Sequence, residues 1–294
     1  MATAPLLDRQ FLEKLERLTI QWQKSFAGLV GGHQAARFAG AGLEFFEHRH
    51  FHHGDDLRAV NWRAYMRLEK LFLKMFQVEP RVPVHLLVDR SLSMTTGESG
   101  KFDQARRIAA ALCYIGLVRL DTIAVIPFTG ALGDKFLCGG GRHRFSPVLE
   151  FLTALEPGGR TDFLKVARQF LSSHHERGLL VIISDFLDDA DCAKPLQYLA
   201  DFGHELLLIQ VWSDQDRQPP WLGELELTDA ESGESLRIWV DEKARESYTR
   251  AFDSYRDALE ELSLRNSGRY VGVSDSMPIE DVIFDSLVRA RGFA

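Results

Sequence analysis

Five short apolar segments, separated by stretches of helical periodicity, limit the fold of this chain more than any other feature of its sequence. They lie at residues 84–89 (VHLLVD), 122–128 (TIAVIPF), 179–184 (LLVIIS), 205–212 (ELLLIQVW) and 269–273 (RYVGV). Nearly continuous apolar strands of this kind are typical of a parallel sheet that is covered on both faces. Helices are predicted at 102–119, 145–155, 162–175, 189–202, 242–265 and 279–290. The alternation predicts an α/β fold with a mostly parallel sheet and helices on both faces.

Two segments depart from this alternation. After the strand at 122–128, the glycine-bearing stretch FTGALGDKFL lets residues 133–138 return as a short antiparallel edge strand. Residues 222–240 (LGELELTDAESGESLRIWV) alternate between polar and apolar side chains on either side of a Ser-Gly turn. This pattern predicts a β-hairpin inserted late in the α/β domain.

The residues before position 80 have a different organisation. Apolar side chains recur at helical spacing over residues 6–27, at Leu7, Phe11, Leu12, Leu15 and Leu18. Gly31, Gly32 and the small residues of 36–42 interrupt this helix. Strands are then predicted near 43–50 and 71–79, with a turn at Gly54 and a short helix around Trp62. Because Pro80 and Pro83 mark a boundary, we expect an N-terminal module over 1–80 and an α/β domain over 81–294.

Composition narrows the functional classes. A net charge of −7 over 294 residues argues against nonspecific binding to nucleic acid or to an anionic membrane. The three cysteines are far apart and show neither metal-ligand spacing nor a disulfide framework, which fits a reducing compartment. No apolar run approaches the roughly 20 residues of a membrane span, and charges occupy the place of a signal-peptide core. These features predict a cytoplasmic protein without a membrane span.

Oxygen-bearing side chains follow two of the predicted strands. Asp89, Ser91 and Ser93 come at the end of the strand at 84–89, and Asp185 directly follows the strand at 179–184. Thr161 lies between them in the loop GGRTDF. Ligands of open α/β sheets gather outside the carboxyl ends of strands, so neighbouring strands would bring these five residues together. Carboxylates and hydroxyls are hard ligands, which predicts a site for Mg²⁺ or Mn²⁺.

The spacing Asp89-x-Ser91-x-Ser93, together with Thr161 and Asp185, resembles the metal-ion-dependent adhesion site of von Willebrand factor A-type domains. The resemblance implies a Rossmann-like sheet, usually with one antiparallel edge strand. It also implies that the hydroxyls bind the ion directly, while the acids often act through water or hydrogen bonds.

The region upstream resembles the signature of a bacterial family named domain of unknown function fifty-eight (DUF58). The matching elements are Gly42 to Phe45, Arg49 with Phe51, Gly54 to Arg58, and Asn61-Trp62. Asn61 occupies a position where the family usually has Asp, which leaves a charge-dependent role there open. The resemblance implies association with AAA+ ATPases of the MoxR type, in which such proteins act as adaptors for chaperone-like assembly or remodelling.

Three other motifs have competing interpretations. The segment TTGESGK (95–101) lacks the glycine and the Ser or Thr of a phosphate-binding P-loop, so we interpret Lys101 as the start of a helix. The segment HRHFHH (48–53) could bind a transition metal, although a solvated strand end is the simpler interpretation. Asp55 and Asp56 could form a catalytic carboxylate pair, but a turn in which Asp55 caps the following short helix and Asp56 or Arg58 forms an ion pair is favoured.

Taken with these resemblances, the sequence predicts a non-enzymatic, divalent-cation-dependent adaptor that binds a protein partner. We expect that partner to offer an acidic residue to the ion. Two alternatives stay open: a metal-dependent phosphate-ester hydrolase with Asp89 as nucleophile, and a scaffold whose metal site is vestigial.

Overall fold

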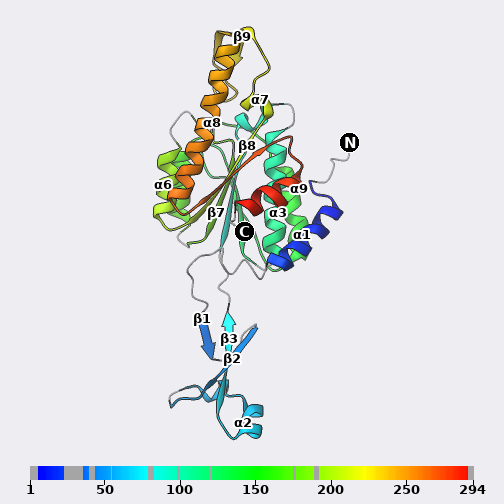
Figure 1. Ribbon diagram of the computed structural model, residues 1–294, viewed down its shortest axis with the longest axis vertical. Coiled ribbons are helices and arrows are strands. Elements are labelled where there is room, and N and C mark those ends of the chain that lie inside the picture. The colour runs from blue at the N-terminus through cyan, green and yellow to red at the C-terminus, as the bar shows by residue number, and fades with distance from the viewer. Residues whose placement is uncertain are drawn as a thin grey trace. The chain divides into compact units, whose positions relative to one another are not determined.

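The computed structural model describes residues 6–22, 36–39, 44–53, 55–78, 83–97, 100–118, 121–174, 177–188 and 192–290 (Figure 1). The chain forms two compact units, one of Val30–Arg81 and one that combines Met1–Leu29 with Val82–Ala294. The sequence also placed a boundary near residue 80, but it assigned the N-terminal helix to the smaller module. The structure places that helix in the larger unit.

The N-terminal helix, α1 (Arg9–Trp22), belongs to the larger unit because its apolar face packs there. Phe11 and Leu15 are buried in the core of the larger unit, beside helix α3 (Lys101–Val118). The ring of Phe11 lies 5.8 Å from that of Phe284, between centroids. The predicted stripe is therefore real, but its partners lie more than 80 residues away in the sequence. The side chain of Leu18 lies outside the described residues.

The larger unit is built on the predicted sheet. Its strands are β4 (Val84–Asp89), β5 (Ile123–Phe128), β6 (Phe136–Cys138), β7 (Leu179–Ser184), β8 (Glu205–Trp212) and β11 (Arg269–Ser274). Their order is β11-β8-β7-β4-β5-β6; β6 pairs antiparallel with β5, and the other pairs are parallel. The Rossmann-like, mostly parallel fold with an antiparallel edge is confirmed. The strand order reverses between β4 and β7, which is where such sheets bind ligands.

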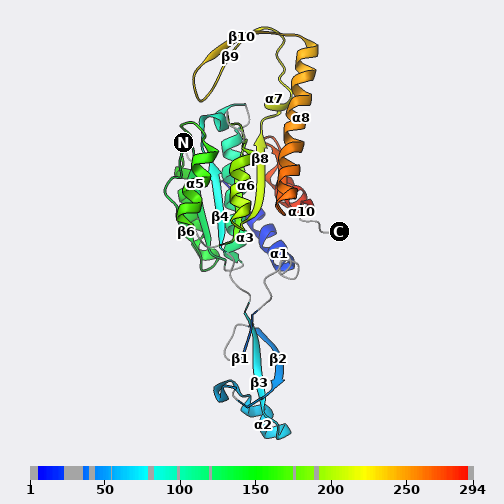
Figure 2. The same ribbon diagram turned by 90° about the vertical axis from the view of Figure 1, so that its left-hand side faces the viewer.

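Helices cover both faces of this sheet (Figures 1 and 2). Leu86 and Val88 of β4 belong to the core under α1, α3 and α4 (Phe145–Ala154). Leu87, which points to the opposite face, packs in the core with α5 (Phe163–Ser173) and α6 (Ala193–Asp201). Alternate residues of one strand thus enter two separate cores, which explains why its sequence is apolar throughout.

The last part of the chain contains the predicted hairpin. After β8 come the short helix α7 (Asp214–Arg217), strands β9 (Gly223–Thr228) and β10 (Ser235–Val240), and the long helix α8 (Glu242–Arg265). Strands β9 and β10 pair antiparallel with each other, with Thr228 opposite Ser235. Figure 2 shows this hairpin bending from the end of α8 back over the carboxyl ends of the sheet strands. The predicted final helix is divided into α9 (Ile279–Asp281), a π-helical turn and α10 (Leu287–Arg289).

The smaller unit is an antiparallel sheet with one helix. Strands β1 (Ala36–Ala39), β3 (Phe72–Val78) and β2 (Glu44–His50) lie in that order, and α2 (Trp62–Leu68) precedes β3. β2, β3 and α2 were predicted, whereas β1 falls in a stretch expected to interrupt structure. The predicted breaks at Gly31, Gly32 and Gly42, the turn at Gly54 and the boundary residue Pro80 lie outside the described residues. No helix in the described parts of the chain is both long and apolar enough to cross a membrane.

Candidate functional site

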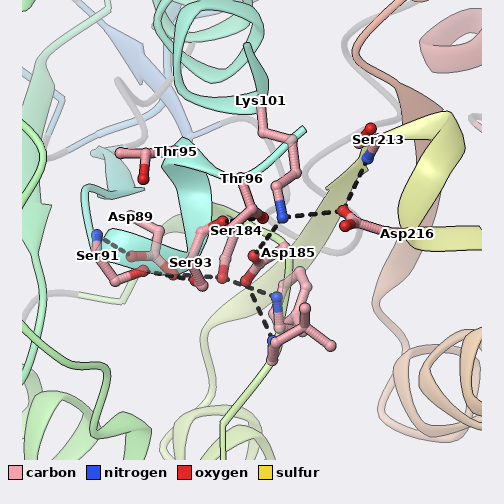
Figure 3. Close-up of polar contacts among 12 residues, drawn as sticks. Asp89, Ser91, Ser93, Thr95, Thr96, Lys101, Ser184, Asp185, Ser213 and Asp216 are labelled. Carbon is pink, nitrogen blue, oxygen red and sulfur yellow. Dashed lines mark hydrogen bonds and ion pairs between the residues drawn. The ribbon is translucent and has the colours of Figure 1, made fainter. Parts of the chain in front are cut away.

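Asp89 is the last residue of β4, and its side chain is fully buried. Each of its carboxylate oxygens accepts a hydrogen bond from a neutral donor. The backbone N–H of Ser91 donates to Oδ1 over 2.9 Å, and the hydroxyl of Ser184 donates to Oδ2 over 2.5 Å (Figure 3). The residue before Asp185 is therefore part of the site, although it was not predicted.

The two serines of the Asp-x-Ser-x-Ser motif form a pair of facing hydroxyls. The chain turns at Ser91 into a 3-10 helix, Leu92–Thr95, and this turn buries the side chains of both Ser91 and Ser93. Their Oγ atoms are hydrogen-bonded to each other over 2.9 Å. Mg²⁺ holds its octahedral ligands at about 2.0–2.1 Å, so two adjacent ligands are separated by about 2.9 Å. The spacing of the two hydroxyls fits one edge of such an ion's coordination shell.

Asp185 directly follows β7, and β7 is the strand that pairs with β4 in the sheet. Its Oδ1 accepts a hydrogen bond from the backbone N–H of Leu187. Its Oδ2 lies 3.0 Å from the ammonium nitrogen of Lys101, which also lies 2.9 Å from Oδ2 of Asp216 in α7 (Figure 3). Lys101 begins α3, as predicted, but its fully buried side chain enters the site. Sequence reasoning did not detect this ion triad.

The charges in this cluster are not balanced at Asp89. Burial lowers the pKa of Lys101, but the carboxylates of Asp185 and Asp216 outweigh it, so the net shift is upward and the ammonium form is favoured. Burial, and then repulsion by Asp185, raises the pKa of Asp89 to about 7, against the opposing effect of its hydrogen bonds. A divalent cation beside Asp89 would supply the missing positive charge. The donor set therefore fits a hard cation.

Thr161 lies in a loop that is tied to the one after β4. The backbone N–H of Leu92 donates to the carbonyl of Gly159, and the N–H of Gly158 donates to the carbonyl of Arg90. Thr161 is only 4% exposed. Its backbone N–H and its hydroxyl both donate to the carboxylate of Glu231, at the tip of the β9–β10 hairpin, each over 3.2 Å. Glu231 is a further site residue that the sequence did not predict.

A pocket of about 360 Å³ lies between the loop after β4 and this hairpin tip. Its lining comes from these two segments and from the loop after β7: Ser93, Thr96, Leu187, Asp188, Asp229, Ala230 and Glu231. The pocket gives the hydroxyl of Ser93 a neighbouring space that a cation or an incoming side chain could enter. Within the described residues, no three His, Cys, Asp or Glu side chains are grouped closely enough to hold a metal ion. A cation here would therefore depend on the hydroxyl ligands.

The acidic pair of the smaller unit has a structural role. Asp55 forms an ion pair with Arg49 over 2.7 Å, and the side chain of Asp56 accepts a hydrogen bond from the N–H of Arg58 at the start of a 3-10 helix. A cap and an ion pair are present, but Asp56 rather than Asp55 forms the cap, and Asp55 forms the ion pair, with Arg49. Asn61 caps α2 through its side-chain oxygen, which an asparagine does as well as an aspartate.

Comparison with known proteins gives a family match. The family model described as "Protein of unknown function DUF58" matches residues 47–258. An uncharacterized protein of Mycobacterium bovis is 28% identical over 254 residues, which cover 85% of this chain and 80% of that protein. A protein of Mycobacterium tuberculosis matches to the same extent.

Solved structures align with part of the chain at low sequence identity. The conserved hypothetical protein BatB from Bacteroides thetaiotaomicron is 14% identical and aligns over 71% of this chain and 98% of its own, with a TM-score of 0.41. The SpRpn10 VWA domain is 13% identical over 72% of this chain and 98% of its own, also with a TM-score of 0.41. Similarities of this size carry no conclusion about function.

Proposed function

The chain belongs to the DUF58 family, and we propose that its larger unit is a non-enzymatic adaptor that binds a protein partner through a divalent cation. The cation is Mg²⁺ or Mn²⁺, and the residues that would hold it are Asp89, Ser91, Ser93, Thr161 and Asp185. The proposal depends chiefly on one observation. Two buried hydroxyls lie 2.9 Å apart beside two buried acids at the carboxyl ends of adjacent strands.

The cation would supply positive charge and an exchangeable coordination position. Three of the five residues are neutral hydroxyls, so these five side chains provide only two negative charges, and Lys101 already lies against one of them. A carboxylate from a partner would bind such an ion favourably, since Mg²⁺ is usually held by one or two carboxylates and keeps several waters. We therefore propose an acidic side chain as the recognised group of the partner. The resemblance to DUF58 proteins further suggests an AAA+ ATPase of the MoxR type as that partner.

The geometry supports binding over phosphate-ester hydrolysis. A nucleophilic aspartate must reach the phosphorus atom, yet the side chain of Asp89 is 0% exposed and both of its oxygens accept hydrogen bonds. We expect the purified protein to hydrolyse neither ATP nor generic phosphate esters in the presence of Mg²⁺. Metal-dependent turnover that is lost in Asp89→Asn would support the hydrolase instead.

Thermal unfolding with and without Mn²⁺ tests the cation site. A ligand that binds only the folded state stabilises it by about 2.7 kcal/mol at 100 times its Kd. We expect Mn²⁺ to raise the melting temperature of the wild-type protein and not that of Ser93→Ala. Thr95→Ala is the matched control, because Thr95 lies in the same turn but donates its hydroxyl proton to the carbonyl of Leu92. An equal shift in Ser93→Ala would place the ion elsewhere, and no shift in any variant would favour the vestigial site.

A further inference from the structure

The tip of the β9–β10 hairpin is built to hold Glu231 in one position. The carboxylate of Asp229 accepts hydrogen bonds from the backbone N–H groups of Glu231 (2.8 Å) and Ser232 (2.6 Å). The N–H of Asp229 donates to the carbonyl of Glu234, and the hydroxyls of Thr228 and Ser235 lie 3.0 Å apart below the turn. These bonds close the tip, and they fix the backbone from which the side chain of Glu231 extends.

Glu231 differs from its neighbours in what it contacts. The residues on either side of it in the tip are exposed, whereas Glu231 is partly buried. Its two carboxylate oxygens each accept one hydrogen bond from Thr161, Oε2 from the backbone N–H and Oε1 from the hydroxyl. The backbone N–H and the hydroxyl of Thr161 therefore form a two-donor cradle for a carboxylate, and Glu231, which fills this cradle, lines the pocket beside Ser93.

The contact with Glu231 leaves the hydroxyl of Thr161 able to bind a cation as well. A threonine hydroxyl has one proton to donate and two lone pairs to offer. When the proton points to Glu231, the lone pairs remain for the ion. Two further carboxylates, Asp188 and Asp229, also line the pocket. Repulsion among these two carboxylates and that of Glu231 opposes the approach of the hairpin tip to Thr161, and a divalent cation would reduce that repulsion.

We infer that Glu231 is the chain's own ligand for this site: it occupies the carboxylate subsite that an acidic partner residue would take. The inference rests on the proposed cation-dependent function. It implies that the hairpin tip must leave before a partner's Glu or Asp can bind. We expect the partner's group to be a carboxylate, because the two donors of Thr161 already bind a carboxylate, that of Glu231, in this structure.

Separation of the hairpin tip from Thr161 should require little free energy. Among the strands that the structure describes, β9 and β10 pair only with each other, and most of their residues are exposed. A two-stranded hairpin is only marginally stable by itself in water. Its position over the sheet therefore depends on contacts at its ends, among them the Glu231–Thr161 pair at the site and the attraction between Asp229 and Arg160.

Binding of Mn²⁺ to the purified full chain, followed by electron paramagnetic resonance, tests this inference. Loss of a residue that supports a metal ligand typically weakens metal binding by about 10- to 100-fold, and we expect a loss in that range for Glu231→Ala. Glu234→Ala is the matched control, because it removes the same charge from the same tip. Acetate should restore Mn²⁺ affinity in Glu231→Ala by entering the vacated cradle, and it should not do so in the wild type.

Hydrogen exchange of the tip amides gives a second measurement. We expect Mg²⁺ to slow exchange over residues 230–233 in the wild type and in Glu234→Ala, and not in Glu231→Ala. Unchanged Mn²⁺ affinity in Glu231→Ala, with tip exchange still responsive to Mg²⁺, would overturn the inference and leave the proposed function intact. Absence of Mn²⁺ binding in the wild type would instead refute the proposed function, and this inference with it.

Discussion

Replacement of Lys101 by Met tests the charge arrangement of the site most directly. The ammonium group of Lys101 is fully buried and lies within 3.0 Å of carboxylate oxygens of both Asp185 and Asp216. Methionine fills a similar volume without the charge, so the variant leaves two carboxylates without their cation. Removal of one partner from a buried ion pair costs about 3–5 kcal/mol. For a domain of this size, each kcal/mol corresponds to about 2–4 °C, so the melting temperature should fall by about 6–20 °C.

The pH dependence of the stability lost in Lys101→Met shows whether unbalanced carboxylate charge causes the loss. Burial and repulsion by Asp185 already raise the pKa of Asp89 in the wild type, and in Lys101→Met no ammonium group offsets the charge of Asp185, so the pKa of Asp89 should rise further above that of the unfolded chain. Groups with raised pKa values bind more protons in the folded state, so the variant gains stability as the pH falls through those values. The difference in unfolding free energy between wild type and variant should therefore be large at pH 7 and smaller at pH 5.

Urea unfolding monitored by circular dichroism at the two pH values provides the measurement. Lys165→Met is the control, because Lys165 is exposed on α5 and its loss should change stability by no more than about 0.5 kcal/mol. A second substitution, Asp216→Asn, should return part of the stability lost in Lys101→Met. The reasoning is refuted if Lys101→Met costs less than about 1 kcal/mol, or if its cost does not change between pH 7 and pH 5.

Two further predictions concern the opposite end of the sheet. Burial, and then the neighbouring His174, lowers the pKa of His85 from 6.5 to about 4, so the unfolded chain binds more protons between these values. Acidification from pH 6.5 to 4.5 should therefore cost about 2 kcal/mol through this residue alone. His85→Phe should remove that part of the acid loss in urea titrations, and an unchanged loss would contradict the assignment. A Cβ at Gly178 would lie 2.1 Å from the carbonyl oxygen of Pro83, whereas one at Gly158 meets nothing within 4 Å. Gly178→Ala should thus unfold at a clearly lower temperature than Gly158→Ala, and equal melting temperatures would show that the backbone yields without cost.

The secondary structure could be predicted because it depends on local patterns. The apolar runs that became β4, β7 and β8 are buried on both faces, and the alternation in 222–240 became β9 and β10. The same local logic placed Asp89 and Asp185 at the ends of strands. Since parallel strands end at one edge of a sheet, both acids were expected near each other once β4 and β7 proved to be neighbours.

The contacts that complete the site depend on tertiary structure alone. Lys101 and Asp185 are 84 residues apart, and Thr161 and Glu231 are 70 apart, so no periodicity relates them. A lysine at the start of a helix and a glutamate in a hairpin turn are both ordinary surface residues by sequence. Their roles arise because the packing of α3 directs Lys101 inward and the return of the hairpin brings Glu231 to Thr161. The sequence by itself determined which side chains stand at the carboxyl edge of the sheet; only the fold determined which charges face them, because charge pairing acts between segments that local patterns do not connect.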